Sequence, residues 1–228
     1  MKKITLLLTA LAFTFAAQAQ KKETRKVGAF DYVSLGISAD LVITQGSSNS
    51  LVLEGDAEDL EDIETYVKDG KLKIKTESSS WFGNNMGDVK IQVTLVDFRG
   101  ASVSGSGFIT NSNNLKGNNV SLSVSGSGKI QIFIESKSLD AHISGSGRIN
   151  LEGKTNAMDL HISGSGGVNS IEFATNVLEA HISGSGSAKV SVKDEIDAHI
   201  SGSGSIRYEG NPAKIREKVS GSGSVRSM

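Results

Sequence analysis

Residues 139–151 read LDAHISGSGRINL, and this stretch decides the fold. Its odd positions from 139 to 143 are aliphatic, while the even positions carry Asp140, His142 and Ser144. Strict alternation of this kind predicts a half-buried β-strand with its aliphatic side chains pointing inward. Another aliphatic residue, Ile149, follows the tetrapeptide SGSG and is also expected to point inward. The whole pattern therefore predicts a strand, a corner and a further strand.

The tetrapeptide recurs through the second half of the chain at intervals of 18 to 21 residues. Its seven copies begin at Ser104, Ser125, Ser144, Ser163, Ser183, Ser201 and Ser220. A fixed period near 20 is typical of solenoids, in which each unit buries its apolar face by stacking on its neighbours. The sequence therefore predicts an all-β fold, a right-handed parallel β-helix (β-solenoid) with coils of about 19–20 residues, because parallel crossovers are right-handed by default.

Gly/Ser tetrapeptides often form flexible linkers. Linkers are not flanked on both sides by alternating aliphatics, however, so we interpret each tetrapeptide as a corner of a coil. There, glycine would allow a backbone conformation or a close approach that a side chain would block. The serines would then form structural hydroxyl columns.

The part of the chain before the repeats, residues 27–100, is less regular but rich in strand patterns. Candidate strands are 32–35, 41–44, 51–54, 72–75 and 89–96, separated by turns such as Asp69-Gly70. Residues 56–66 carry aliphatics at helical spacing after Asp56, a plausible N-cap, and predict one short helix. No linker separates this part from repeats 101–228, so residues 20–228 are expected to form a single β-solenoid domain.

Residues 1–19 have the pattern of a signal peptide. Lys2 and Lys3 precede an apolar stretch, and Ala17-Gln18-Ala19 provides a small-x-small cleavage site. A membrane anchor is the alternative, but the stretch is short and interrupted by threonines. Export to the periplasm, the outer-membrane surface or the extracellular space is expected.

Composition excludes several function classes. The formal net charge of −1 gives no sign of the excess positive charge that nucleic-acid-binding proteins carry. The lack of cysteine excludes disulfides and thiol chemistry. No segment after the leader reaches the roughly 20 apolar residues of a membrane span, so an integral membrane protein is not expected. Nucleophile elbows, phosphate-binding loops and dinucleotide or metalloprotease motifs are missing from the sequence, which predicts neither catalytic residues nor a cofactor.

All four histidines of the chain occupy one position of the repeat. They are His142, His161, His181 and His199, and an acidic residue precedes each by two places. A solenoid would arrange them as adjacent outward columns of imidazoles and carboxylates, about 4.8 Å from coil to coil. Such imidazoles could bind zinc or copper. The favoured interpretation is a solvated polar face, because the column is open and lacks side chains that would fix the ring tautomers.

The only tryptophan of the chain lies in the Gly/Asn-rich stretch 78–87. Trp81 and Phe82 could stack on a sugar ring or contact a partner protein. Alternatively, these aromatics could cover an open end of the solenoid. They are the predicted ligand-binding residues.

The sequence resembles the auto-transporter adhesin family with a head GIN domain, known from exported proteins of Bacteroidetes. The similarity rests on segments 30–33 (FDYV), 39–46 (ADLVITQG) and 70–74 (GKLKI), and on the recurrent [V/I]SGSG units. The resemblance implies a right-handed β-helix, export to the envelope or beyond, and an adhesive role. It implies no catalytic or ligand-binding residue.

These observations predict an exported, non-catalytic protein of the cell envelope or surface that acts as an adhesin-like binding module. Its expected partner is a glycan or a surface or matrix protein. The alternatives are a carbohydrate-active β-helix enzyme, with the Asp/Glu and His columns as its only candidate groups, and a metal-binding histidine ladder. Charges at Lys214, Arg216, Glu217 and Lys218, near the last coil, favour a monomer over end-to-end association.

Overall fold

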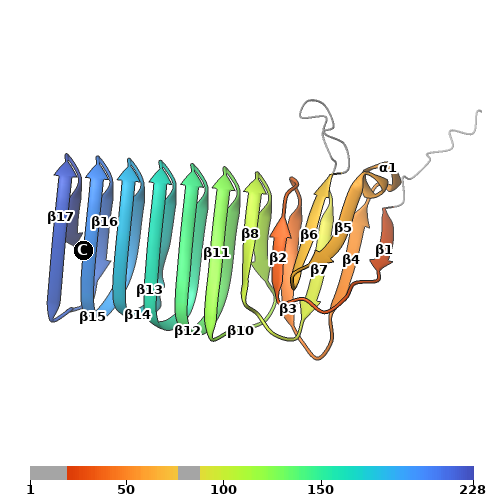
Figure 1. The fold of residues 1–228 in the computed structure, drawn as a ribbon, viewed down its shortest axis with the longest axis horizontal. Helices are drawn as coiled ribbons and strands as arrows, with labels where there is room; N and C mark the ends of the chain where they lie inside the picture. The colour runs from red at the N-terminus through yellow and green to blue at the C-terminus, as the bar shows by residue number, and fades with distance from the viewer. Residues whose placement is uncertain (1–19, 77–87) are drawn as a thin grey trace, which may run out of the picture.

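The chain forms an elongated β-solenoid of about seven turns that ends in a cap of antiparallel strands (Figure 1). The structure is a computed structural model and describes residues 20–76 and 88–228. Within these ranges, no helix combines the length and the apolar character needed to cross a membrane. The predicted signal peptide, residues 1–19, lies outside the described residues.

The repeats supply the regular coils, as the sequence predicts. Their strands are β8 (Gly100–Gly105), β9 (Phe108–Asn111), β10 (Leu115–Lys116), β11 (Asn119–Gly126), β12 (Lys129–Gly145), β13 (Arg148–Gly164), β14 (Gly167–Gly184), β15 (Ser187–Gly202), β16 (Ser205–Glu209), β17 (Lys214–Gly221) and β18 (Ser224–Ser227). Neighbouring coils pair in parallel, and each SGSG unit aligns with the next, for example Ser144 with Ser163. The predicted parallel stacking is confirmed.

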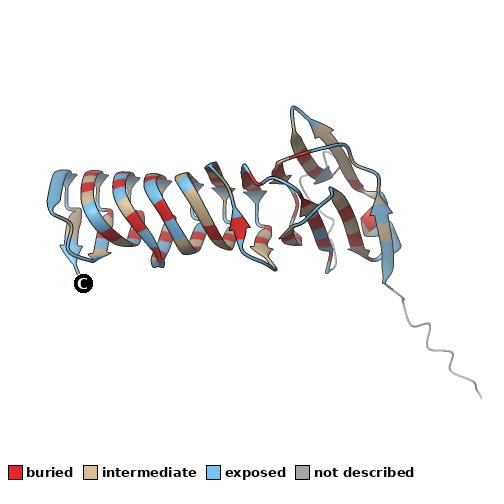
Figure 2. Cartoon of the chain, turned by 90° about the horizontal axis from the view of Figure 1, so that it is seen from below, coloured by how far each residue is buried: buried red, intermediate tan, exposed pale blue. Residues whose placement is uncertain are grey.

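Buried residues recur along the coils (Figure 2), and most of them are aliphatic. Leu139, Ala141 and Ile143 are each at most 2 % exposed, and the residues aligned with them in β13, β14 and β15 are equally buried. Ile149, beyond the corner, is also fully buried. The period-two pattern of residues 139–151 therefore places its aliphatics as predicted.

The two glycines of each tetrapeptide have different roles. Gly164, the first glycine of its unit, has a φ of 111°, and a Cβ there would lie 2.6 Å from the carbonyl oxygen of Gly145 in the preceding coil. Gly166, the second, has no such φ, but its Cβ would lie 2.4 Å from Cγ2 of Ile143. One position needs the left-handed region and the other a close approach, so the corner interpretation is confirmed.

The less regular part before the repeats continues the parallel stack, but not in the order of the sequence. Strands β2 (Tyr32–Leu35) and β3 (Asp40–Gln45) pair in parallel with β8 and β9 on one side. On the other side they pair in parallel with β6 (Lys71–Thr76) and β7 (Lys90–Leu95). The coil that comes first in the sequence therefore lies between two later ones.

Antiparallel strands close this end of the solenoid. Strand β4 (Ser50–Gly55) runs against β7, β1 (Lys21–Arg25) against β4, and β5 (Ile63–Lys68) against β6. Arg25 of β1 donates hydrogen bonds to the carbonyl oxygens of Leu60 and Ile63, which ties β1 to the start of β5. Each of the five predicted strands is present, whereas β1 and β5 were not predicted.

The predicted short helix is confirmed, but it is shorter than the predicted range 56–66. Helix α1 spans Ala57–Glu61, and Asp56 occupies the N-cap position without a side-chain capping hydrogen bond. From Ile63 onward the chain is β5, which forms a hairpin with β6 across Asp69-Gly70, both with positive φ. Backbone pairing with β6 overrides the helical spacing of the aliphatics, because Ile63 is buried equally well from a strand.

Candidate functional site

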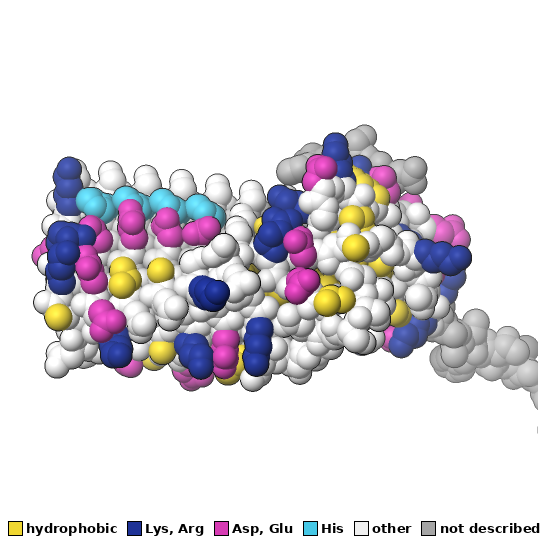
Figure 3. All heavy atoms as spheres, turned by 60° about the horizontal axis from the view of Figure 1, so that its bottom comes forward, with side chains coloured by type: hydrophobic (Ala, Val, Ile, Leu, Met, Phe, Trp, Pro, Cys, Tyr) yellow, Lys and Arg dark blue, Asp and Glu magenta, His cyan; other side chains and the backbone are white. Residues whose placement is uncertain are grey.

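An acid, a histidine and a serine recur at alternate positions of four consecutive strands, β12 to β15. Because side chains two residues apart share one face of a strand, the three kinds of residue form three parallel columns. The strand pairing aligns Asp140 with Asp159, Glu179 and Asp197, and the histidines and serines follow the same register. The acids and histidines form adjacent stripes along the solenoid (Figure 3).

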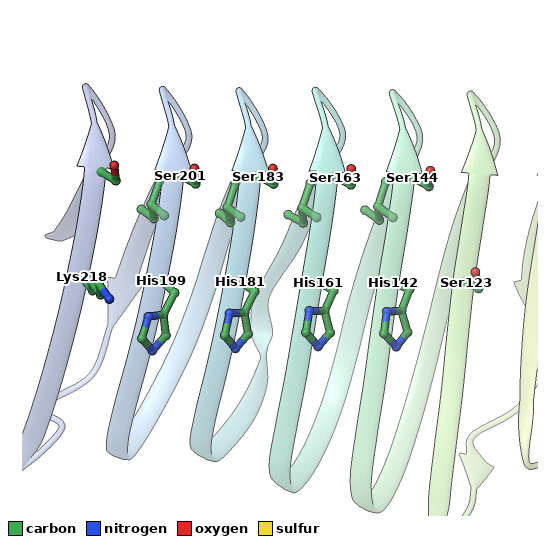
Figure 4. Close-up of a pocket in the computed structure, with 15 residues that line it drawn as sticks. Ser123, His142, Ser144, His161, Ser163, His181, Ser183, His199, Ser201 and Lys218 are labelled. Atoms are coloured by element: carbon green, nitrogen blue, oxygen red, sulfur yellow. The ribbon is translucent and has the colours of Figure 1, made fainter.

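The four imidazoles are stacked face to face along the solenoid axis (Figure 4). Their ring centroids are 4.9, 5.0 and 4.9 Å apart in sequence order, and the rings deviate from parallel by at most 8°. This spacing follows the distance between paired parallel strands. The predicted histidine column is confirmed.

The acid of the same strand approaches the ring in three of the four coils. Nε2 lies 2.9 Å from Asp159 Oδ1 at His161, 3.1 Å from Glu179 Oε1 at His181 and 3.0 Å from Asp197 Oδ1 at His199. The approach is aligned as a hydrogen bond at His181. There, an ionised carboxylate can only accept, so Nε2–H donates to Glu179, and in the neutral form of the ring Nδ1 is then an acceptor.

The contact between Asp159 and His161 differs from the hydrogen bond between Glu179 and His181. Its Oδ1 is shielded from solvent yet accepts no aligned hydrogen bond among the described residues, although Nε2 of His161 is close. The contact is therefore an electrostatic approach rather than a well-formed hydrogen bond. The acid column thus orients some rings more firmly than others.

The columns keep their register although the coils differ in length. His161 and His181 are 20 residues apart and His181 and His199 are 18 apart, yet both pairs are directly aligned. The difference is absorbed elsewhere in the coil: residues 171–173 of β14 lie between the pairs Ser170–Val190 and Ala174–Ser191. The bulges therefore leave the face with the histidines evenly spaced.

A groove runs along the solenoid between the histidine and serine columns (Figure 4). It encloses about 510 Å³, with the imidazoles on one side and Ser144, Ser163, Ser183 and Ser201 on the other. The isoleucine between each His and Ser, such as Ile162, contributes to the floor while remaining 2 % exposed. The groove thus offers the same set of groups once per coil.

The two ends of the groove differ in charge. Ser123 aligns with His142 at one end, and Lys218 aligns with His199 at the other. Beside Lys218, Arg216 donates hydrogen bonds to Asp197 at 2.8 Å and to Glu195 at 2.7 Å. The hydrogen bond from Arg216 is the main cause that lowers the pKa of Asp197, and the charges of Arg216 and His199 act in the same direction.

The stacked histidines do not converge on a common point. Nitrogen lone pairs lie in the ring plane, so parallel rings 4.9 to 5.0 Å apart do not direct two nitrogens at one ion. Among residues 20–76 and 88–228, no group of three or more His, Cys, Asp or Glu side chains is arranged to hold a metal. Metal binding by this column stays a prediction, and it requires the rings to turn.

The other predicted site residues, Trp81 and Phe82, lie outside the described residues. Sequence reasoning missed the groove itself, because the serines were assigned a purely structural role in the corners. The available signal was their position two residues after each histidine, which places both on one face.

Comparison with solved structures identifies neighbours that share almost the whole chain. A putative adhesin from Bacteroides fragilis is 26 % identical, with a TM-score of 0.87, and the match covers 93 % of this chain and 98 % of that one. A putative lipid binding protein from Parabacteroides distasonis is 25 % identical, with a TM-score of 0.71 and the same coverage. A putative adhesin from Parabacteroides merdae, 20 % identical with a TM-score of 0.77 over 93 % and 97 % of the two chains, shares the fold.

No curated protein matches the chain. A family model described as "Putative auto-transporter adhesin, head GIN domain" matches residues 29–212, which include β2 to β16 and all four histidines. The chain belongs to this family, as the resemblance of segments 30–33, 39–46 and 70–74 and of the [V/I]SGSG units indicated.

Proposed function

We propose that the chain is an exported, non-catalytic binding protein of the cell envelope or surface with an adhesin-like role. One observation carries the proposal: the acid, histidine and serine columns repeat in register over four coils, and the histidines and serines line one groove. Identical subsites suit a long or repetitive partner, whereas catalysis requires one set of unlike groups. The family and the Bacteroides fragilis neighbour support an adhesive role.

Binding of the purified chain without its leader to an array of glycans and matrix proteins tests this proposal. We expect saturable binding to a member of the array that weakens when His161 and His181 are both replaced by Ala. A second variant, Trp81→Ala with Phe82→Ala, tests the predicted aromatic contact separately. Circular dichroism establishes that both variants are folded. If the folded wild-type chain bound no member of the array, the proposal would be contradicted.

A carbohydrate-active enzyme is the first alternative, because Asp159 and His161 place an acid and a potential base 2.9 Å apart on an open face. Product release from a panel of polysaccharides, lost in Asp159→Ala with His161→Ala, would establish it. Polysaccharides left intact by the wild-type chain would count against it.

Metal sequestration is the second alternative, because an imidazole nitrogen and a carboxylate oxygen adjoin in three successive coils. Titration with zinc or copper would show one or more tight sites that a variant with all four histidines replaced lacks. Equal binding by both proteins would remove this alternative.

We propose that the protein is a monomer. Glu217 in β17 aligns with the inward Ala198 of the preceding coil, where an apolar residue would suit further stacking, and it is exposed. A charge directed towards the core opposes pairing of another apolar coil at this edge. Sedimentation of the wild-type chain should give one protomer mass, and a concentration-dependent dimer would contradict this.

A further inference from the structure

We propose that the groove between the histidine and serine columns binds a linear, neutral, β-linked polysaccharide in extended form, with one sugar residue per coil. This inference rests on the proposed binding function and specifies its ligand. It uses the described residues of β11 to β17 alone.

The direction and period of the groove select the kind of polymer. The groove runs along the solenoid axis, and its imidazoles repeat every 4.9 to 5.0 Å. An extended β-1,4-linked chain advances by about one pyranose ring length per residue, which is close to this step. An extended peptide advances about 3.3 Å per residue, and a nucleic-acid strand in a duplex about 3.4 Å, so neither places one residue at each imidazole.

The groups along the walls match the edges of a sugar ribbon. Such a ribbon carries hydroxyls along both edges, and each hydroxyl can donate and accept a hydrogen bond. On one wall, each serine hydroxyl provides a donor and acceptors. On the other, the ring of His181 contacts Glu179 through Nε2, so the neutral form of the ring offers Nδ1 as an acceptor.

The charge pattern favours a neutral chain. One carboxylate stands two residues before each of the four histidines, so a polyanion along the groove would run beside a row of like charges. Lys218 provides a cation only at one end of the groove. Uronate-rich, sulfated and phosphate-bearing polymers are therefore disfavoured.

The histidines along the groove keep an even spacing although the coils differ in length. Coil lengths vary from 18 to 20 residues between the histidines, and the bulges that absorb the variation lie away from the groove. Four equal steps are what a polymer with a single repeat requires for simultaneous contact. Affinity then grows with the number of occupied subsites, since each added residue meets a preformed one.

Titration with soluble β-1,4-linked oligosaccharides of increasing length, together with pull-down on cellulose and chitin, tests the inference. We expect affinity to increase stepwise up to about four residues, one for each histidine, and to level off once the groove is filled. Amylose and dextran, which are α-linked and do not extend with this period, should bind about tenfold more weakly or worse. Equal binding of α- and β-linked chains, or affinity independent of length, would overturn the inference.

Variants locate the binding face. His161→Gln with His181→Gln removes two rings but keeps polar side chains, and should weaken oligosaccharide binding by about tenfold. The matched control is Asn150→Ala with Asn169→Ala, which alters an aligned outward column on the other side of the corner in the same two strands. It should bind like the wild type, and equal losses in both variants would overturn the placement.

The outcomes separate this inference from the proposed function on which it rests. Saturable binding to a matrix protein or peptide without any glycan would overturn the polysaccharide ligand while leaving a binding protein. Absence of binding to glycans and proteins alike, by a chain shown to be folded, would overturn both.

Discussion

His161 and His181 stack with ring centroids 5.0 Å apart although the segment between them is one residue longer than that between His142 and His161. Direct pairing of the flanking residues, Leu160 with Ala180 and Ile162 with Ile182, holds the rings opposite each other. The additional residue enters the coil near residues 171–173. The solenoid thus tolerates length variation on one side and keeps a fixed repeat on the other.

Phe173 stabilises that irregular segment, and its loss should be costly. Its side chain is fully buried where β14 departs from the register of β15. Phe173→Ala would leave a cavity that rigid neighbouring coils cannot close, so we expect a loss of about 3–5 kcal/mol in unfolding free energy. Urea unfolding measures it. Val177→Ala, at a position 40 % exposed in the same strand, should change stability by no more than about 0.5 kcal/mol; similar losses in both variants would contradict the packing role.

The corner glycines allow backbone strain to be separated from steric clash. Gly164 and Gly105 have nearly the same φ, 111° and 110°, but only at Gly164 would a Cβ meet the preceding coil, at 2.6 Å from a backbone oxygen. Gly105→Ala should therefore cost about 1–2 kcal/mol for the left-handed conformation alone. Gly164→Ala should cost about 1–3 kcal/mol more, because the coils would have to separate.

Thermal and urea unfolding of the two glycine variants provide the measurement. The far-UV spectrum should stay that of a β protein in both. Equal destabilisation would show that contact between coils contributes nothing, and that the conformation of glycine alone explains the SGSG corner.

The repeat pattern was sufficient to predict the solenoid, its parallel register and the histidine column, because each depends on local alternation and a constant period. The part of the chain before the repeats lacks this period, so the period does not predict which of its strands lie next to each other. The position of β2 between β6 and β8 was therefore not predictable from alternation. It depends on pairing between segments that are distant in the sequence.

Two local errors have clearer causes. Leu60, Ile63 and Val67 have helical spacing, but Asp69-Gly70 is a strong signal for a two-residue hairpin, and a hairpin requires a strand immediately before it. That signal indicates β5 and could have limited the helix to Ala57–Glu61.

The groove was missed because a Gly/Ser corner was treated as structural only, although its first serine faces outward beside the histidine.

Asn111 continues the strand ladder with its side chain, and its replacement should destabilise the middle of the solenoid. Its Nδ2 donates to the carbonyl oxygen of Phe133 and its Oδ1 accepts from the Phe133 N–H, each at 3.0 Å. Asn111→Ala leaves both partly buried groups unpaired, so we expect a loss of about 1–3 kcal/mol. Asn111→Asp keeps the acceptor but not the donor and should lose less than Asn111→Ala at pH 7. Exchange of the Phe133 amide hydrogen measures the effect locally, and unchanged protection in Asn111→Ala would contradict it.

The ion pair of Arg216 with Asp197 should give the solenoid an acid-sensitive contribution to stability. Nε of Arg216 donates to Asp197 Oδ2 at 2.8 Å, and this hydrogen bond is the main cause that lowers the pKa of Asp197 in the folded chain. A carboxyl with a lower pKa in the folded than in the unfolded state stabilises the fold above the unfolded value of about 3.9. The contribution is lost as the pH falls from there through the folded pKa, because the proton then binds equally to both states.

Arg216→Ala should therefore raise the pKa of Asp197 towards its ordinary value and remove this part of the acid dependence. Carboxyl carbon shifts followed by NMR between pH 2 and pH 6 measure the titration directly. Arg207→Ala provides the control, since Arg207 is also exposed and lies in β16, which is hydrogen-bonded to β15 away from Asp197. A titration of Asp197 that is the same in Arg216→Ala and in the wild type would show that the ion pair does not hold in solution.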